Sequence, residues 1–180
     1  MDGAFAVACC GRPGPVVLLF ADDKHCMPAE PEMRGIPLGP YPLDPVMPPL
    51  DADRGVAERL LSSRNPVIVA GGGVHLSSAC AALAGLQEHF SLPVATTVMG
   101  KGGVDERHPL SLGVLANATG PGSAGRHQRP ILEEADFILL VGTRTDQNAT
   151  DSWTLYPSDA VFAHIDMDSG EVGRNYEAIR

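Results

Sequence analysis

The sequence predicts an α/β protein with a parallel, doubly wound sheet, and two observations support this fold class. Four apolar runs show no alternation of apolar and polar residues, which is typical of strands that are buried on both faces. Segments with the apolar spacing of helices separate these runs, so consecutive strands are expected to be parallel and joined by right-handed crossovers. The predicted strands are residues 66–70, 92–98, 137–142 and 160–166.

Composition separates the chain into three zones. Residues 1–26 contain the apolar run 16–20, which has the composition of a strand but no other strand nearby to pair with. Residues 27–50 hold half of the chain's 16 prolines and are interpreted as a linker, because proline removes a backbone donor and disfavours helix before it. Interleaved apolar residues favour a strap on a surface over a disordered tail. Residues 51–180 carry the α/β pattern.

The helices of residues 51–180 are predicted from capping residues and apolar spacing. Asp51 or Asp53 can cap a first helix that ends near residue 61, and Ser77 or Ser78 can cap a second. A long loop follows the second strand, and a third helix is expected near residues 129–135. The apolar residues expected to face the sheet are Val56, Leu60 and Leu61 in the first helix, and Ala79, Leu83, Leu86 and Phe90 in the second.

Charge and hydropathy exclude several classes of function. A net charge of −9, a pI near 5.0 and the lack of a basic stripe argue against nucleic-acid binding. No apolar run approaches the roughly 20 residues that cross a bilayer, and the first residues lack the features of a signal peptide. The four cysteines lack metal-ligand spacing and are interpreted as reduced thiols. A cytoplasmic location is therefore expected, with neither a membrane nor a nucleic-acid partner.

The predicted strands end in residues suited to ligand binding. In an open parallel sheet, ligands bind outside the carboxyl ends of the strands. Glycines there allow backbone N–H groups to approach a ligand, and an acidic residue can bind ribose hydroxyls. A small-molecule nucleotide is therefore the predicted ligand, although a glycine triplet can also form a tight turn and Asp166 can also cap the segment after it. The strand-end segments are Gly71, Gly72 and Gly73, then residues 96–102, 142–146 and 166–168.

Other polar residues allow two interpretations each, and none is assigned to catalysis. Lys101 either reaches a phosphate or remains a solvated loop lysine, and Arg144 pairs either with Asp146 or with an anionic ligand. No nucleophile elbow and no Cys/His pair is visible, so hydrolytic chemistry has no support. No metal ligand is assigned either, because the histidines share no ligand spacing and are predicted to be surface or satisfied residues. These histidines are His75, His108, His127 and His164.

Several blocks of sequence, taken in order, point to a known family. Residues 65–74 read Asn-Pro-Val-Ile-Val-Ala-Gly-Gly-Gly-Val, and residues 93–102 read Pro-Val-Ala-Thr-Thr-Val-Met-Gly-Lys-Gly. Further blocks follow at residues 108–113, 134–144 and 164–168. Together they resemble the Rossmann-like middle domain of thiamine-diphosphate enzymes of the acetolactate (acetohydroxyacid) synthase group. Residues 11–16 resemble the turn and last strand of that family's pyrimidine-binding domain, so residues 1–26 are interpreted as its edge.

The resemblance implies a larger parent enzyme with three domains. Such parents are carboligases or decarboxylases of 2-oxo acids, hence transferases or lyases, and assemble as homodimers or homotetramers. Their cofactors are thiamine diphosphate, which supplies the carbanion chemistry, and Mg²⁺. The family holds them with a glutamate of the pyrimidine domain and with a Gly-Asp-Gly motif. This chain has no Gly-Asp-Gly and starts after the place of that glutamate, so it is expected to be inactive alone.

In this family the middle domain binds FAD, ADP or no ligand. FAD-binding members have Leu-Gly-Met-His where this chain has Leu-Ala-Asn-Ala at residues 115–118, and a second arginine where it has Asn148. These departures favour ADP or an empty site over FAD. By resemblance, the cofactor contacts would fall on Gly71, Gly72, Gly73, Thr97, Val98, Met99, Gly142, Thr143, Arg144, Asp146, Asp166 and Met167.

Three hypotheses about function follow. The first is a fragment of an acetolactate-synthase-like enzyme, whose middle domain has a structural or nucleotide-binding role. The second is a standalone nucleotide-binding or scaffold module. A sirtuin-like deacylase would share the sheet architecture, but the sequence shows neither the catalytic histidine context nor the zinc-ligand cysteines that it needs.

Overall fold

The computed structural model describes residues 2–28, 47–116 and 120–179 of the chain. The chain divides into two compact units, Met1–Val46 and Met47–Arg180, and each is considered by itself. Most of the predicted linker, residues 27–50, lies outside the described residues.

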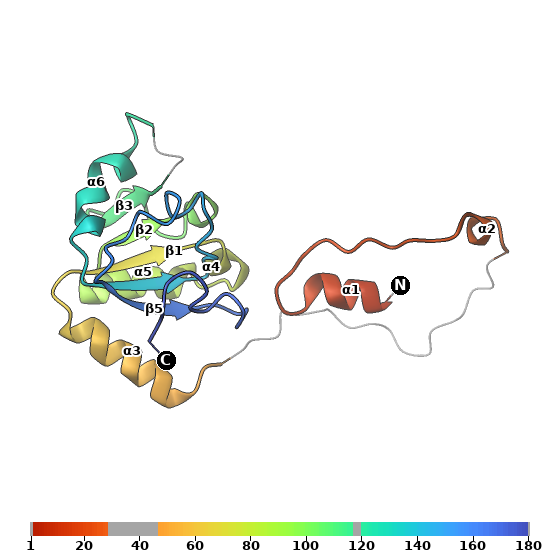
Figure 1. The fold of residues 1–180 in the computed structure, drawn as a ribbon, viewed down its shortest axis with the longest axis horizontal. Helices are drawn as coiled ribbons and strands as arrows, with labels where there is room; N and C mark the ends of the chain where they lie inside the picture. Colours follow the sequence, from red (N-terminus) through yellow and green to blue (C-terminus); the bar gives the residue numbers. More distant parts are fainter. Residues whose placement is uncertain (1, 29–46, 117–119, 180) are drawn as a thin grey trace. The chain divides into compact units, whose positions relative to one another are not determined.

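Five parallel strands form the sheet of the second unit (Figure 1). Their order across the sheet is β3-β2-β1-β4-β5, and every neighbouring pair is parallel. This confirms the predicted fold class. In chain order the strands are β1 (Pro66–Ala70), β2 (Val94–Thr96), β3 (Ser111–Val114), β4 (Phe137–Val141) and β5 (Val161–Ile165).

The sequence prediction missed β3, which lies in the segment predicted to be a long loop. This strand is short, and its Gly113 has a φ of 72°, outside the strand region. Its pairing with β2 also shifts register between Val94 and Ala95. Neither an apolar run nor an alternating pattern therefore marks β3 in the sequence. The prediction also made β2 too long, because Thr97 caps a 3₁₀ turn, η1 (Val98–Gly100).

The helices of the second unit lie close to their predicted places, but their caps differ. The N-cap of the first helix is Pro49, so Asp51 and Asp53 lie in its first turn. Their negative charges still stabilise the helix there, because its N-terminal end carries a partial positive charge. Ser77 and Ser78 lie in a turn between two helices and cap neither N-terminus. The helices are α3 (Leu50–Ser62), α4 (Gly73–Leu76), α5 (Cys80–Phe90) and α6 (Ala124–Glu133), and α6 begins before the predicted residue 129.

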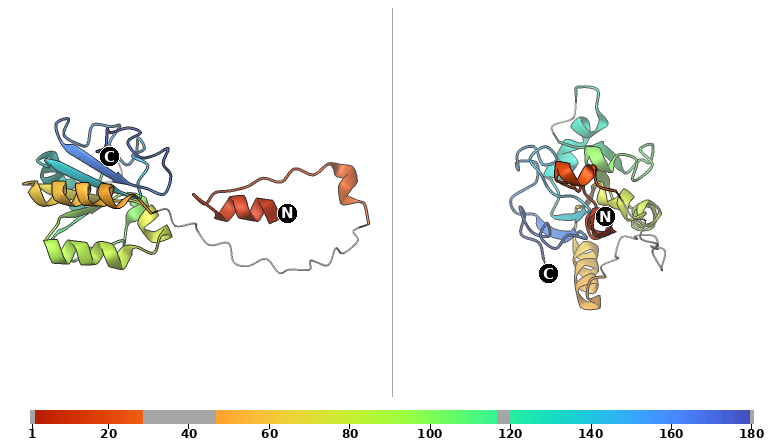
Figure 2. Two further views of the ribbon diagram at one scale, coloured as in Figure 1. Left: turned by 90° about the horizontal axis from the view of Figure 1, so that it is seen from below. Right: turned by 90° about the vertical axis from the view of Figure 1, so that its right-hand side faces the viewer.

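Both faces of the sheet are covered, as its continuous apolar strands indicate. Successive strand residues point to opposite faces. Val67 and Val69 pack on one face with Leu132 of α6, and Ile68 and Ala70 pack on the other. The second face is covered by α3 and α5, which run along the same side of the sheet (Figure 2). Two predicted core positions are wrong, because the Leu61 and Phe90 side chains are 66% and 46% exposed.

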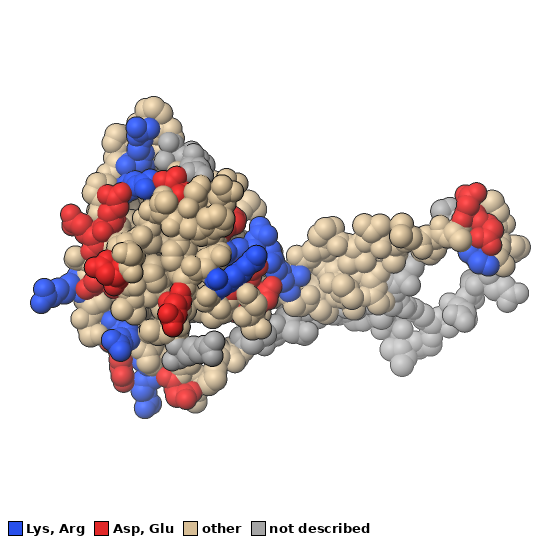
Figure 3. Space-filling view, viewed as in Figure 1, with Lys and Arg blue, Asp and Glu red and all other residues tan. Residues whose placement is uncertain are grey.

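The first unit contains two helices, α1 (Asp2–Cys9) and α2 (Asp22–His25). The prediction of a strand at residues 16–20 is wrong, because no strand forms there. The side chains of Val17 and Leu19 are 79% and 91% exposed. A strand needs a neighbour for its backbone hydrogen bonds, and the described part of this unit offers none. Figure 3 shows a largely uncharged surface over α1 and the segment after it. None of the described helices is long and apolar enough to span a bilayer.

Candidate functional site at the carboxyl edge of the sheet

The loops after β1 and β4 meet at the point where the strand order reverses. The chain passes from β1 to β2 and β3 on one side, and then crosses to β4 on the other side of β1. Gly71 N–H donates to Val141 O at 2.8 Å, and Gly73 N–H donates to Gly142 O at 3.0 Å. Ligands of open α/β sheets bind in the crevice at such a switch point. The structure therefore brings Gly71, Gly73 and Gly142 together at the expected edge.

The three glycines after β1 are explained by the packing of neighbouring loops. A Cβ atom on Gly73 would lie 2.6 Å from Gly142 Cα, and one on Gly72 would lie 3.2 Å from Met99 Cβ. A Cβ atom on Gly71 would collide with the backbone of Gly142 and with Thr143. Glycine is thus required by the close approach of three loops. The space beside these Cα atoms is filled by protein, so contacts to a ligand must come from other atoms of the loops.

The loop after β2 presents two apolar side chains to solvent. Thr97 N–H donates to Ala70 O at 2.9 Å, and Thr97 Oγ1 accepts from Gly100 N–H at 3.2 Å. This buried threonine fixes the start of η1. Val98 and Met99 are 57% and 73% exposed beside the glycine loop. An exposed apolar pair at this edge can pack against a planar ring.

The loop after β4 contributes one exposed cation. Thr143 is buried, whereas the Arg144 side chain is exposed. Asp146 Oδ1 accepts from Ala149 N–H at 2.9 Å, so Asp146 stabilises the turn that follows it. Among the described residues, Arg144 forms no ion pair with Asp146. The structure therefore does not show the first of the two alternatives for Arg144, and the anionic ligand stays a prediction.

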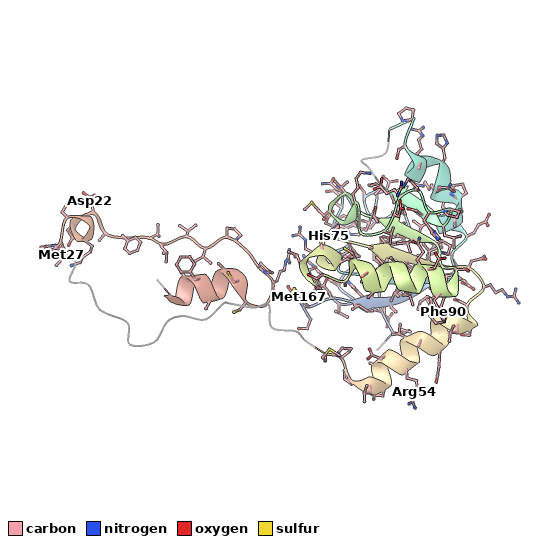
Figure 4. The ribbon with its side chains drawn as sticks, turned by 180° about the vertical axis from the view of Figure 1, so that it is seen from behind. Asp22, Met27, Arg54, His75, Phe90 and Met167 are labelled. Carbon is pink, nitrogen blue, oxygen red and sulfur yellow. The ribbon has the colours of Figure 1, made fainter. Side chains whose placement is uncertain are left out.

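The loop after β5 closes the edge on the other side of β4. Gly142 N–H donates to Ile165 O at 2.8 Å, which places Asp166 and Met167 beside the β4 loop. One carboxylate oxygen of Asp166 accepts from Asp168 N–H at 2.9 Å. Asp166 and Met167 are both half-buried. Figure 4 shows Met167 and His75 at the same end of the sheet, opposite to Phe90.

His164 of β5 is a satisfied, half-buried histidine, as the sequence predicted. Its Nε2 contacts Thr143 O at 2.9 Å, and its Nδ1 accepts from Gly173 N–H at 3.3 Å. A carbonyl only accepts, so the neutral ring carries its proton on Nε2. Burial lowers the pKa of His164. The ring therefore joins β5, the β4 loop and the C-terminal segment, and is fully engaged by these contacts.

Comparison with known proteins identifies the family. Residues 54–179 match the sequence profile of the central domain of thiamine pyrophosphate enzymes. The chain belongs to this family. The matched residues include all five strands and every strand-end loop described above.

The curated relatives are much longer than this chain. It is 34% identical over 182 residues to the "Probable acetolactate synthase large subunit" of Methanococcus aeolicus, with 96% of this chain and 28% of the relative covered. It is 35% identical over 179 residues to the "Acetolactate synthase" of Arthrospira platensis, covering 96% and 30%. It is 33% identical over 176 residues to the "Glyoxylate carboligase" of Escherichia coli O157:H7, covering 97% and 28%. The chain thus spans less than a third of these proteins.

A cavity of about 320 Å³ lies beside the end of β3 in this thiamine pyrophosphate enzyme central domain. Ala116 lines it with a φ of 77°, the left-handed region that favours glycine. Arg129 also lines it, and its guanidinium is held by Asp151 at 2.6 Å and Glu133 at 2.8 Å. The lining residues are Leu115, Ala116, Gly125, Arg126, Arg129 and Leu155. The sequence prediction did not single out Arg126 or Arg129, because neither follows a predicted strand.

Two further side chains make contacts that the sequence left open. Lys101 Nζ lies 2.6 Å from Glu106 Oε2, so this exposed lysine forms a surface ion pair. Cys80 Sγ lies 3.4 Å from His75 Nδ1, and this Cys/His contact is not visible in the sequence. Residues five apart do not share a helix face, and only the turn between α4 and α5 brings them together. Within the described ranges, no three His, Cys, Asp or Glu side chains gather as metal ligands.

Proposed function

We propose that this chain serves as the central domain of a thiamine-diphosphate enzyme that joins or decarboxylates 2-oxo acids. Membership of the family and the names of the acetolactate synthase and glyoxylate carboligase relatives support this proposal. When bound, thiamine diphosphate with Mg²⁺ supplies carbanion stabilisation. This chain has no Gly-Asp-Gly motif to hold the diphosphate, so its own part is positional and not catalytic. A cytoplasmic location and assembly of the parent as a homodimer or homotetramer belong to the same proposal.

Within that role, we propose that the carboxyl edge of the sheet binds an adenine nucleotide. The observation that carries this is the meeting of the β1 and β4 loops at the strand-order reversal. In this proposal the exposed Arg144 binds a phosphate, and the exposed Val98 and Met99 cover a base. Asp166 keeps one carboxylate oxygen for a ribose hydroxyl. These residues offer contacts to the phosphate, the base and the ribose of a nucleotide such as ADP.

FAD fits this chain less well than ADP does. The backbone at Ala116 takes a φ of 77°, and FAD-binding members resemble this segment but have glycine there. The added methyl group therefore occupies a place where glycine would let a ligand approach. Asn148 replaces the second arginine, so one positive charge is missing. Both differences remove contacts that the larger cofactor needs.

Calorimetric titration of the purified chain with ADP and with FAD tests this proposal. We expect saturable binding of ADP, and about tenfold weaker binding to an Arg144→Gln variant, because a charge-assisted hydrogen bond to phosphate is lost. Lys101→Gln is the matched control, since Lys101 is paired with Glu106, and ADP affinity should not change. Absence of ADP binding, or equal loss in both variants, would overturn the nucleotide proposal. Tighter binding of FAD than of ADP would overturn the preference between the two.

A further inference from the structure

We propose that Cys80 is a reactive thiol, activated by His75, that exchanges with small-molecule disulfides. Cys80 is the first residue of α5, and His75 lies in α4. Ser78, with a φ of 54°, turns the chain between the two helices. As a result, Cys80 Sγ lies 3.4 Å from His75 Nδ1. A thiol and a basic nitrogen are thus within hydrogen-bond reach.

The state of the imidazole is fixed by a third group. His75 Nε2 lies 3.1 Å from Lys101 O, and a backbone carbonyl can only accept a hydrogen bond. The neutral ring therefore carries its proton on Nε2 and turns the lone pair of Nδ1 toward the thiol of Cys80. A nucleophile, a base and a group that orients the base are the three parts of an activated nucleophile. The structure supplies all three with Cys80, His75 and Lys101.

The pair is accessible to a small reagent. The His75 side chain is exposed and Cys80 is half-buried. Figure 4 shows His75 at the end of the sheet where α4 begins, far from Phe90 at the other end of α5. Access to the thiol therefore agrees with the geometry of the pair.

The exchange needs no oxidant other than the disulfide itself. The Cys80 sulfur attacks one sulfur of a small disulfide, while His75 Nδ1 takes the thiol proton. The S–S bond of the reagent breaks, and the leaving thiolate then takes the proton from His75. The products are a mixed disulfide at Cys80 and one small thiol.

The mixed disulfide has a structural consequence next to the strand-end loops. Its sulfur has no hydrogen to donate to His75, so the contact that holds the imidazole on one side is lost. His75 links α4, which follows the glycine loop of β1, to the backbone that follows η1. Modification of Cys80 would therefore loosen the connection between the β1 and β2 loops. The proposal stands on its own geometry and does not depend on a bound nucleotide.

Brief treatment of the full chain with oxidised glutathione, followed by peptide mass spectrometry, tests the proposal. We expect Cys80 to form the mixed disulfide roughly tenfold faster than Cys26, because a positioned base removes its proton. Cys26 is the internal control, since it is the more exposed thiol and would react faster if exposure alone decided the rate. Equal rates, or faster reaction at Cys26, would overturn the proposal.

A His75→Gln variant separates base action from simple proximity. The glutamine amide nitrogen lies about as far from the backbone as His75 Nε2 and can still donate to Lys101 O, but glutamine cannot take up the thiol proton. We expect the rate at Cys80 to fall to that of Cys26, and the rate at Cys26 to stay unchanged. An unchanged rate at Cys80 in this variant would show that His75 is not the activating group and would overturn the proposal. In a Cys80→Ser variant the mass of the modified Cys80 peptide should disappear, which confirms that the measured rate belongs to Cys80.

Discussion

At the scale of single residues, the glycine loop after β1 is the most constrained feature of the edge. A Cβ atom on Gly73 would lie 2.6 Å from Gly142 Cα and 3.1 Å from Gly142 O. These are backbone atoms of a neighbouring strand end and cannot rotate away as a side chain could. The loop must therefore shift to accept any larger residue, and overpacking of this kind typically costs about 1–3 kcal/mol.

We expect Gly73→Ala to lower the free energy of unfolding by about 2 kcal/mol, measured by urea denaturation followed by circular dichroism. Gly85→Ala is the control. Gly85 lies in the exposed part of α5, and no atom lies within 4 Å of the position that a Cβ atom would take there. Alanine at this position should raise stability by up to about 1 kcal/mol, because it favours helix. Equal effects of the two substitutions would show that the loops do not pack as described.

Sequence reasoning at this scale predicts which residues gather at one edge of the sheet, but not why the glycines stand there. The predicted contact residues do gather at the carboxyl ends of the strands, because parallel strands must end together. The sequence nevertheless explains Gly71 and Gly73 as openings for a ligand, whereas the β4 loop fills that space. Likewise, Cys80 and His75 share no periodic spacing, since they belong to different helices. Contacts of this kind depend on tertiary packing and leave no local signal.

At the scale of elements, apolar length decides which strands can be predicted. β1 and β4 are five-residue apolar strands covered on both faces, and β5 is five residues long with Phe162 and Ala163 buried, so each is visible in the sequence. β3 lies at the edge of the sheet, contains Gly113 at a φ of 72° and shifts register against β2. Such a strand forms because its neighbour presents free backbone groups. Its own residues do not specify it.

The connection between β5 and the C-terminal segment gives a pH-dependent prediction. Burial lowers the pKa of His164 in the folded protein, and the nearby Asp166, Thr143 O and Glu171 offset this in part. The unfolded chain therefore binds the proton more tightly than the folded one. Stability from neutral His164 is fully present above the ordinary value of 6.5 and is lost as pH falls below it. Protonation of Nδ1 also breaks its bond from Gly173 N–H.

We expect the wild-type chain to lose more unfolding free energy than a His164→Gln variant when pH is lowered from about 7.5 to about 5.5. Glutamine can donate and accept hydrogen bonds but does not titrate in this range. Urea denaturation of both proteins at both pH values measures the difference. The other histidines are common to both proteins and cancel in the comparison. An identical loss in the two proteins would contradict the assignment to His164.

At the scale of the whole molecule, the two units contribute differently. Every buried hydrophobic residue described belongs to Met47–Arg180, where two core clusters cover the two faces of the sheet. In the first unit, the apolar side chains of residues 16–20 are exposed. The part of the chain with a complete core is thus the part that matches the central domain of thiamine pyrophosphate enzymes.

The central proposal is that this chain provides that domain and not the thiamine site itself. Calorimetric titration of the full chain with thiamine diphosphate and Mg²⁺ tests it most directly. We expect no saturable binding, because the chain has no Gly-Asp-Gly motif to hold the metal and diphosphate, and no metal-ligand cluster exists among its described residues. Tight, stoichiometric binding of thiamine diphosphate to this chain alone would contradict the proposal.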